Sequence, residues 1–518
     1  MSKLFTFFIL ITFFCLSSYS KDDIPSFAVE NALSRKSFLI DTLRTQHIYV
    51  YTEKDFIVKS SVKSVVFELK NNIIVNSTIK FKGQKSYYIK GNGFSIKEKD
   101  HLKPILSLPY KAESWSLDRE GEQMTIKLRD SLFFFSKNRD SIYIVYESWF
   151  RRFKDKVLSI SDSTIVFKCN EKFLSNKKFQ SLTPSPFFYL EEKPALENKL
   201  YRLFDIGHNT CMLIDDLIFD CSSICCIANY GDLKIRNCVF KNIEGKGIWS
   251  KGNLFVERTF FHGFTSYPIE AQAQSYLDVT YSKFEDIGMR GDNIACISAK
   301  GDAYIANNMF LNYNYCAIKL GRRSCNIYPS SVVENNILVW TPDWERKMEV
   351  YGLTDGGAIY ISTCNKRAIV RYNTILKFGG HKANRAIYCD DGAFNVTIYG
   401  NVISGTRNSY DIDSRDCSKK WKKQGRDSVH CPNTGNYIGY NICDGKLKLE
   451  GASAIPNNGC VFENNIILGR NTNTKDIVNG NSQCDKAIIY DCDGYIDNKG
   501  EVFIKKFKKK TNVYAPTL

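Results

Sequence analysis

The sequence predicts an all-β protein built on a parallel β-helix, with a β-rich side domain inserted near the N-terminus. Short runs of β-branched and aromatic residues recur at nearly constant spacing, and they show no helical periodicity. An asparagine also recurs at the same place in many of these runs. Periods of 20 to 30 residues with a strand–turn–strand pattern indicate a stacked solenoid. Leucine-rich repeats share the period, but their leucine spacing and helical return are missing here.

The repeat is clearest in the middle of the chain. The runs LKIRNCVF, LFVERTFF, LDVTYSKF and AYIANNMF begin at Leu233, Leu254, Leu277 and Ala303, which are 21, 23 and 26 residues apart, and each ends in phenylalanine. A parallel coil places equivalent positions about 4.8 Å apart along the axis. We therefore expect the terminal phenylalanines to stack inside the helix.

A column of asparagines accompanies the later repeats, two residues before the terminal apolar position. Its members are Asn308, Asn336, Asn373, Asn401, Asn441 and Asn465. Stacked asparagine side chains can hydrogen-bond along the axis and satisfy the amides of turns. We therefore assign this polar column to the scaffold and not to the chemistry.

Five segments follow from this pattern. Residues 1–20 are a signal peptide, 21–110 the N-terminal coils, 111–200 the β-rich insertion, 201–470 the main β-helix with the site, and 471–518 a C-terminal cap with a basic tail. The insertion breaks the rhythm with runs such as SIYIVYESWFRRF. A cap is expected because an uncovered edge strand invites aggregation.

The first residues predict export. Lys3 precedes an apolar run from Leu4 to Leu16, and Ser18-Tyr19-Ser20 provides a small-x-small cleavage site. That run is too short for a transmembrane helix, and no later stretch reaches the roughly 18 apolar residues needed. We expect an exported protein, periplasmic, secreted or on the cell surface, with no transmembrane segment.

The formal net charge of +16 suggests an anionic partner. Part of this charge is local, because the segment KKFKKK at 505–510 is typical of a solvated tail. A lysine-rich soluble surface explains the remainder equally well. Export and the lack of a nucleic-acid-binding motif argue against a nucleic-acid partner.

The candidate site lies between Asp355 and Asp416. Two long excursions, 338–375 and 403–443, bracket it, and long loops beside one face of a solenoid usually form its cleft. Aligning the runs CAIKLGR, GAIYIST, RAIYCDD and DIDSRD gives an inward column of Ile318, Ile359, Ile387 and Ile412. Alternation then places two columns on the outer face. These are Lys319, Tyr360, Tyr388 and Asp413, and Gly321, Ser362, Asp390 and Arg415.

Two carboxylates dominate this outward patch. Asp390 and Asp413 would lie one coil and two residues apart, roughly 8 Å between Cα atoms. Such a pair suits a general acid and a nucleophile or base, and it spans the separations of both retaining and inverting glycosidases. Asp391, at the strand end, is the third catalytic candidate. Equally, Asp390-Asp391-Gly392 is a common turn sequence, and an outward aspartate beside Arg415 can be a surface ion pair.

The remaining candidates would bind substrate. Tyr360 and Tyr388 can stack a sugar ring, and Arg415 can hold a substrate carboxylate or fix Asp413. Lys319 adds a cation to the same face. The margins of the patch complete the set with Asp355, Asp416 and His381, the last at a Gly-Gly-His turn where a solvated loop histidine is the alternative. No metal site is expected from the spacing, although calcium is possible among so many carboxylates.

At these residues a resemblance becomes visible. The pattern GGAIYIS, VRYNTIL, AIYCDDGAFNVTIYGNVI and DIDSRD resembles secreted right-handed parallel β-helix proteins of polysaccharide-degrading bacteria, within the pectate-lyase-like superfamily. It covers about residues 350–420 closely and 214–470 by repeat pattern. Some members are glycoside hydrolases of the β-xylosidase and α-fucosidase kinds, and the resemblance implies catalytic carboxylates on the DDG strand and its neighbours. Cys389 stands where leucine is usual, and Asp413-Ser414 replaces Gly-Gly.

Three functions remain open from the sequence. The leading one is a secreted glycoside hydrolase that acts on a polysaccharide or oligosaccharide. The second is a polysaccharide lyase on a uronate-containing polymer, which would need a Lys, Arg, His or Tyr base and charge neutralisation, often by calcium. The third is a non-catalytic carbohydrate-binding or surface protein, because a fold does not fix a function.

Overall fold

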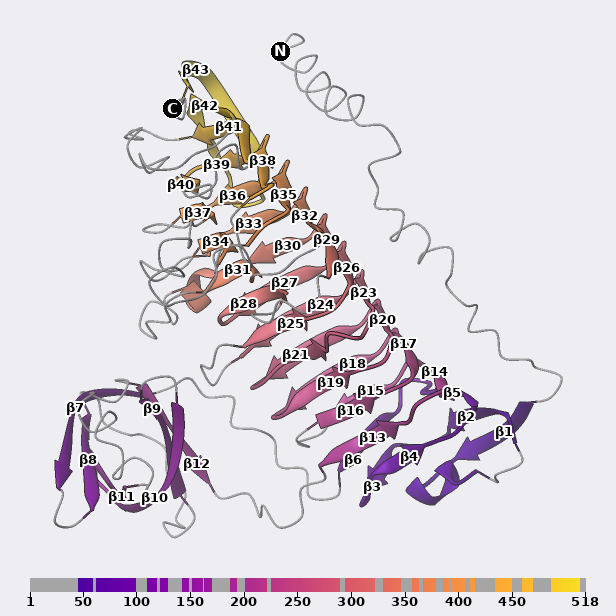
Figure 1. Cartoon of the computed structure of the whole chain (residues 1–518). Coiled ribbons are helices and arrows are strands. Elements are labelled where there is room, and N and C mark those ends of the chain that lie inside the picture. Colours follow the sequence, from indigo (N-terminus) through magenta and orange to yellow (C-terminus); the bar gives the residue numbers. More distant parts are fainter. Residues whose placement is uncertain are drawn as a thin grey trace, which may run out of the picture. The chain divides into compact units, whose positions relative to one another are not determined.

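The protein forms a parallel β-helix, as predicted (Figure 1). The computed structural model describes residues 45–58, 62–98, 110–118, 122–128, 142–148, 151–161, 163–169, 187–192, 201–220, 225–288, 294–321, 329–345, 356–362, 367–378, 385–390, 393–405, 410–414, 434–449, 459–468 and 486–512. Helix in these ranges is confined to the 3₁₀ helix η3 (Glu53–Phe56) and one turn at 342–345. The proposed signal peptide lies outside them.

One sheet of the β-helix, here called sheet 1, has eleven parallel strands. They are β4 (Ile79–Phe81), β13 (Arg202–Ile206), β16 (Cys225–Asn229), β19 (Lys246–Ser250), β22 (Ile269–Ala271), β25 (Ala295–Ala299), β28 (Cys316–Leu320), β31 (Gly357–Ile361), β34 (Arg385–Cys389), β37 (Tyr410–Ser414) and β40 (Lys446–Leu449).

Two further series of strands complete each coil. Sheet 2 contains β1 (Thr45–Val50), β2 (Ser64–Leu69), β5 (Ser86–Lys90), β14 (Cys211–Asp215), β17 (Asp232–Arg236), β20 (Leu254–Glu257), β23 (Leu277–Thr280), β26 (Ala303–Ala306), β29 (Ser330–Glu334), β32 (Arg367–Arg371), β35 (Val396–Tyr399) and β38 (Tyr437–Gly439). Sheet 3 contains β3 (Ile73–Val75), β6 (Ser95–Glu98), β15 (Ile218–Asp220), β18 (Val239–Ile243), β21 (Phe260–Phe264), β24 (Lys283–Ile287), β27 (Met309–Tyr313), β30 (Ile337–Val339), β33 (Thr374–Leu376), β36 (Val402–Ser404) and β39 (Ile442–Cys443). Both series meet at β41 (Val461–Leu468), which pairs with β38 and β39.

The interior is filled by stacked apolar columns, as the repeat predicts. The rings of Phe240 and Phe261 lie 4.9 Å apart and nearly parallel, and those of Phe261 and Phe284 lie 4.7 Å apart. The stack extends to Phe219 on one side and Phe310 on the other. Because each ring covers the next, the column is fully buried and keeps successive coils in register.

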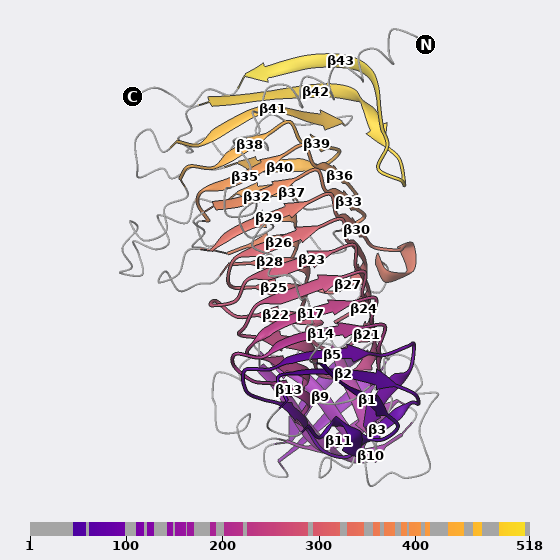
Figure 2. The same ribbon diagram turned by 90° about the vertical axis from the view of Figure 1, so that its right-hand side faces the viewer.

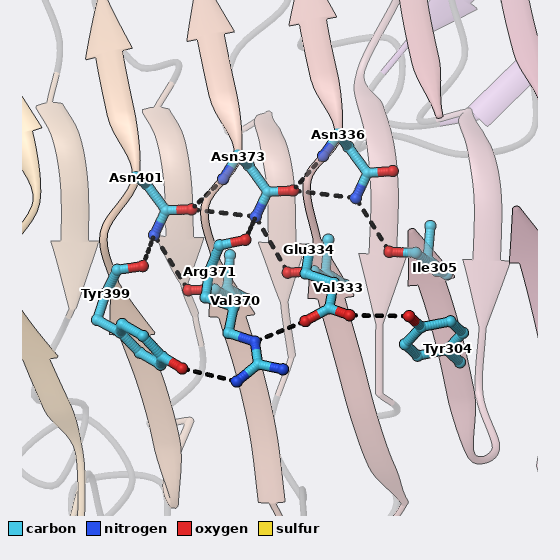
Figure 3. A network of polar contacts seen from close by, with 10 residues as sticks. All are labelled: Tyr304, Ile305, Val333, Glu334, Asn336, Val370, Arg371, Asn373, Tyr399 and Asn401. Carbon is cyan, nitrogen blue, oxygen red and sulfur yellow. Dashed lines mark hydrogen bonds and ion pairs between the residues drawn. The ribbon is translucent and has the colours of Figure 1, made fainter. Parts of the chain in front are cut away.

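The predicted asparagine column is a continuous hydrogen-bonded ladder (Figure 3). Asn336 Nδ2 donates to Asn373 Oδ1 at 2.9 Å, and Asn373 Nδ2 donates to Asn401 Oδ1 at 3.0 Å. Each Oδ1 also accepts the backbone N–H of the preceding ladder residue, and the ladder extends from Asn308 to Asn465. These side chains are buried, so the ladder satisfies turn groups that water cannot reach.

The residues that precede the ladder asparagines form a second column, which is defined by backbone conformation. The residue before each ladder asparagine has a left-handed backbone, with φ of 58° at Asn307, 55° at Asn335 and 57° at Tyr372. Asparagine tolerates this conformation better than most residues. In the pairs Asn307-Asn308 and Asn335-Asn336, the first residue is exposed and suits the left-handed backbone, and the second is buried and supplies the ladder amide.

Strands in the predicted insertion form a closed antiparallel barrel. The barrel contains β7 (Tyr110–Asp118), β8 (Gln123–Leu128), β9 (Ile142–Ser148), β10 (Arg151–Ile160), β11 (Thr164–Lys168) and β12 (Phe187–Glu192). Its own apolar cluster includes Ile126, Ile144, Ile165 and Phe167, all fully buried. The barrel therefore has a core of its own.

A hairpin covers the C-terminal end of sheets 2 and 3 (Figure 2). Strand β42 (Lys486–Ile496) pairs in parallel with β41, and β43 (Val502–Asn512) pairs antiparallel with β42. The segment 505–510, expected as a solvated tail, lies within β43. The turn of the hairpin approaches β33 so closely that a Cβ at Gly500 would lie 2.6 Å from Thr374 Cγ2. Ile496, Val502 and Ile504 pack with apolar residues of sheet 3.

None of the helices in the described ranges has the length and hydropathy that a membrane crossing requires.

Replacing Asn336 with alanine tests the ladder. The change removes the acceptor of the Asn308 backbone N–H, and one partner each of Asn308 Nδ2, the Ile305 carbonyl and Asn373 Oδ1, in a buried place. We expect a loss of about 2–4 kcal/mol in the free energy of unfolding, measured by urea denaturation. The matched control is Asn335→Gly, at the preceding residue, which is exposed and has a left-handed backbone; it should cost less than about 0.5 kcal/mol. Equal effects of the two substitutions would refute the structural assignment.

Candidate active site

The register of sheet 1 brings four of the predicted residues into one outward column. Lys319 pairs with Tyr360, Tyr360 with Tyr388, and Tyr388 with Asp413 in successive strands. The inward neighbours Ile318, Ile359, Ile387 and Ile412 also pair as predicted. Asp390 follows β34 in the next outward column, and its backbone N–H donates to the carbonyl of Ile361.

Asp390 is held by two phenols. Tyr360 donates to Asp390 Oδ2 at 2.5 Å, and Tyr388 donates to Oδ1 at 2.9 Å. The two tyrosine rings meet edge to face, 5.2 Å apart. Since a phenol can both donate and accept, these partners can hold the carboxyl group in either protonation state.

Asp413 has a different partner, an arginine that the sequence analysis missed. Arg385 Nε donates to Asp413 Oδ2 at 2.9 Å, and the side chains are 6% and 0% exposed. The same guanidinium lies 4.3 Å from the centre of the Tyr388 ring. Arg385 therefore neutralises Asp413, a role that the sequence analysis had considered for Arg415.

The predicted exposure of this patch is wrong. Tyr360 is 5% exposed, Tyr388 and Asp413 are fully buried, and Asp390 is 8% exposed. The two tyrosines belong to a second apolar cluster on the outer side of sheet 1, which also contains Tyr315. The carboxylates are therefore buried, and not on an open surface.

Lys319 stays half-exposed at the edge of the cluster. Its Nζ lies 5.1 Å from the centre of the Tyr360 ring and 5.8 Å from that of Tyr315. No ion pair joins Lys319 to an acidic side chain among the residues that the structure describes. Its charge is therefore held by aromatic faces and is available to an anionic ligand.

Five predicted residues lie outside the described ranges: Asp355, His381, Asp391, Arg415 and Asp416. Their participation stays a prediction.

Burial raises the pKa of the Cys389 thiol well above its ordinary value, and the nearby charges of Asp413 and Asp390 add to the effect. Cys389 faces the core and is fully buried. It precedes Asp390 in the chain, but a buried thiol of this kind is inert as a nucleophile.

A third carboxylate, Glu270, lies in the same outward column nearer the N-terminus. Its Oε2 lies 2.5 Å from Lys246 Nζ, and its Oε1 lies 2.7 Å from Lys300 Nζ. Burial acts to raise its pKa, but the hydrogen bonds and charges of the two lysines outweigh burial and lower it. Glu270 is thus an ionised bridge between two lysines.

Within the same ranges, no group of three or more His, Cys, Asp or Glu side chains is arranged to hold a metal ion.

Comparisons with known proteins give weak similarities. No protein-family model matches the chain, and no curated protein matches its sequence. Among solved structures, one described as a glycoside hydrolase has 9% identity and a TM-score of 0.47, over 78% of this chain and 89% of that one. XylC in complex with xylose has 10% identity and a TM-score of 0.31, over 82% and 69%.

A tailspike protein from the Acinetobacter baumannii bacteriophage Fri1, described as a capsular polysaccharide depolymerase, has 8% identity and a TM-score of 0.19, over 88% of this chain and 68% of that one. Similarities of this strength do not assign an activity.

Replacing Arg385 with methionine tests the buried ion pair. It removes the arginine partner of a carboxylate that is buried inside the protein, and removing one partner of a buried ion pair typically costs about 3–5 kcal/mol of the free energy of unfolding. A second change, Asp413→Asn in the same chain, should recover part of that loss. The control is Lys70→Met, which breaks the exposed Lys70–Glu68 pair and should cost less than about 1 kcal/mol. Similar losses for Arg385→Met and Lys70→Met would contradict this account.

Proposed function

We propose that the protein is an exported glycoside hydrolase that uses Asp390 and Asp413 as its paired carboxylates. One observation carries the proposal: two carboxylates lie one coil apart on the same side of sheet 1, and each has a different kind of partner. Two carboxyl groups in unlike surroundings are what acid–base hydrolysis of a glycosidic bond requires.

The partners suggest the division of roles. The ion pair with Arg385 stabilises a negative charge on Asp413, which suits a nucleophile or a base. The phenols of Tyr360 and Tyr388 can follow a change in the protonation of Asp390, which suits the general acid. In this scheme Asp390 protonates the leaving oxygen, and Asp413 acts on the opposite side of the sugar, directly or through water.

Two observations favour other functions. Lys319 beside Tyr360 provides a cation and a phenol on one face, as a lyase acting on a uronate polymer needs. The complete burial of Asp413 favours a non-catalytic protein in which the carboxylates are structural. Incubation with a panel of acidic and neutral polysaccharides separates the three functions. New reducing ends without ultraviolet absorbance indicate hydrolysis, an unsaturated absorbing product indicates a lyase, and binding without product indicates a binding protein.

Once a substrate is found on that panel, single substitutions test the roles. We expect Asp390→Asn and Asp413→Asn each to lower the rate of reducing-end release by about 10²–10⁴-fold, the range typical of a lost acid or base. The control is Asp286→Asn, at a residue of β24 with φ 55°, a backbone conformation that asparagine also tolerates, and it should keep full activity. Thermal unfolding followed by circular dichroism verifies that all three variants fold. Full activity in both folded site variants would eliminate the assignment.

A further inference from the structure

An aromatic–lysine pair on β19 lies outside the site described above. Trp249 follows the inward Ile248 and lies in the outward column that also contains Glu270. Lys251 Nζ lies 5.4 Å from the centre of the Trp249 ring, and the ring of Tyr230 meets that of Trp249 at 5.4 Å and 71°. Trp249 and Tyr230 are half-buried, and Lys251 is exposed, so the group is accessible.

The charge of Lys251 is not compensated by an acidic side chain in the described part of the chain. Lys246 and Lys300, in contrast, are both neutralised by Glu270 on the next coil. The only other lysine on this face with the arrangement of Lys251 is Lys319, whose Nζ also lies over aromatic rings, in the ranges that the structure describes. The face thus presents two aromatic–lysine pairs, one beside the carboxylates and one distant from them.

Such a pair is chemically suited to an acidic sugar. The flat face of an indole covers the apolar face of a sugar ring. The ammonium can leave the aromatic ring, where it gains about 0.5–1 kcal/mol at an exposed site, and form a stronger charge-assisted hydrogen bond with a carboxylate. The bridge formed by Glu270 shows that lysines on this face already hold a carboxylate.

Nucleic acid also combines stacking with positive charge, but the face disfavours it. Glu270, Asp390 and Asp413 lie in the same two outward columns, whereas a phosphate backbone requires a continuous basic track.

We propose that Trp249, Lys251 and Tyr230 form a second carbohydrate-binding site, which takes a carboxylate-bearing unit of a polysaccharide. Backbone pairing places Lys251 and Asp390 in one outward column, through Gln272, Lys300, Gly321 and Ser362. They are five coils apart, or about 24 Å at the usual strand spacing. A chain of several sugars is needed to cover that distance. If the proposed function is right, polymers should therefore be better substrates than short oligosaccharides. The proposed binding of a polysaccharide at Trp249 does not depend on that function.

Affinity electrophoresis of the full chain in gels containing polygalacturonate tests the proposal. Dextran serves as the neutral comparator, and dextran sulfate and oligothymidylate as other anions. We expect the native chain to be retarded by polygalacturonate and little by dextran. Lys251→Gln and Trp249→Ala should each weaken that binding about tenfold, which corresponds to about 1.4 kcal/mol. The charge-matched control Lys499→Gln, at the exposed hairpin turn, should bind as the native chain does. Trp249→Phe, which keeps an aromatic ring, should retain most of the affinity if Trp249→Ala folds poorly.

Several results would overturn the proposal. One is equal retardation of the native chain and Lys251→Gln. Another is tighter binding of dextran sulfate or oligothymidylate than of polygalacturonate, lost in the same variants, since that would indicate a sulfate or a nucleic-acid site. Asp390→Asn separates this proposal from the catalytic one: it should bind polygalacturonate as the native chain does, whether or not its activity falls.

Discussion

Register between coils is the constraint on which this structure depends. Every interior column, every outward pair and the spacing of the carboxylates require that equivalent residues stay opposite one another along the axis. The amide ladder enforces this. Asn373, for example, accepts two N–H groups from Asn336 on the preceding coil, and its Nδ2 donates to Asn401 Oδ1 on the following coil. A slip of one residue would break these bonds and turn the apolar side chains outward. The phenylalanine stack adds an apolar constraint on the same register.

The sequence predicts the scaffold well, because the scaffold is a repeat. The period located the coils, the asparagines located the turns, and the alignment of four isoleucines gave the correct pairing of Lys319, Tyr360, Tyr388 and Asp413. Each of these is a local pattern that recurs with a fixed physical meaning. The alignment also placed Asp390 on the same face as Tyr360 and Tyr388, but the hydrogen bonds between them were not predicted.

The parts that could not be predicted come from a break in the alternation. In the strands of sheet 1 both Ala386 and Ile387, and both Ala358 and Ile359, contribute to the core. Strict alternation therefore gives the wrong side for residues at the start of these strands. Strict alternation places Arg385 inward, whereas its side chain reaches the outward Asp413. Strict alternation also places Asp411 outward, whereas Asp411 aligns with Ala386 in the core column. Burial of the two tyrosines was also missed, because they share an outer cluster with Tyr315, which lies just before the aligned run CAIKLGR.

The C-terminal hairpin has a consequence for how copies of this chain can meet. A parallel coil ends in an edge that another parallel coil can extend, and a stack with two such edges could grow head to tail into a fibre. In β42 and β43 the direction of the chain reverses, so the last strand runs antiparallel to the stack. At this edge of sheets 2 and 3, a coil from a second molecule would find neither the strand direction nor the asparagine ladder it needs. The hairpin thus blocks head-to-tail extension along two of the three sheets.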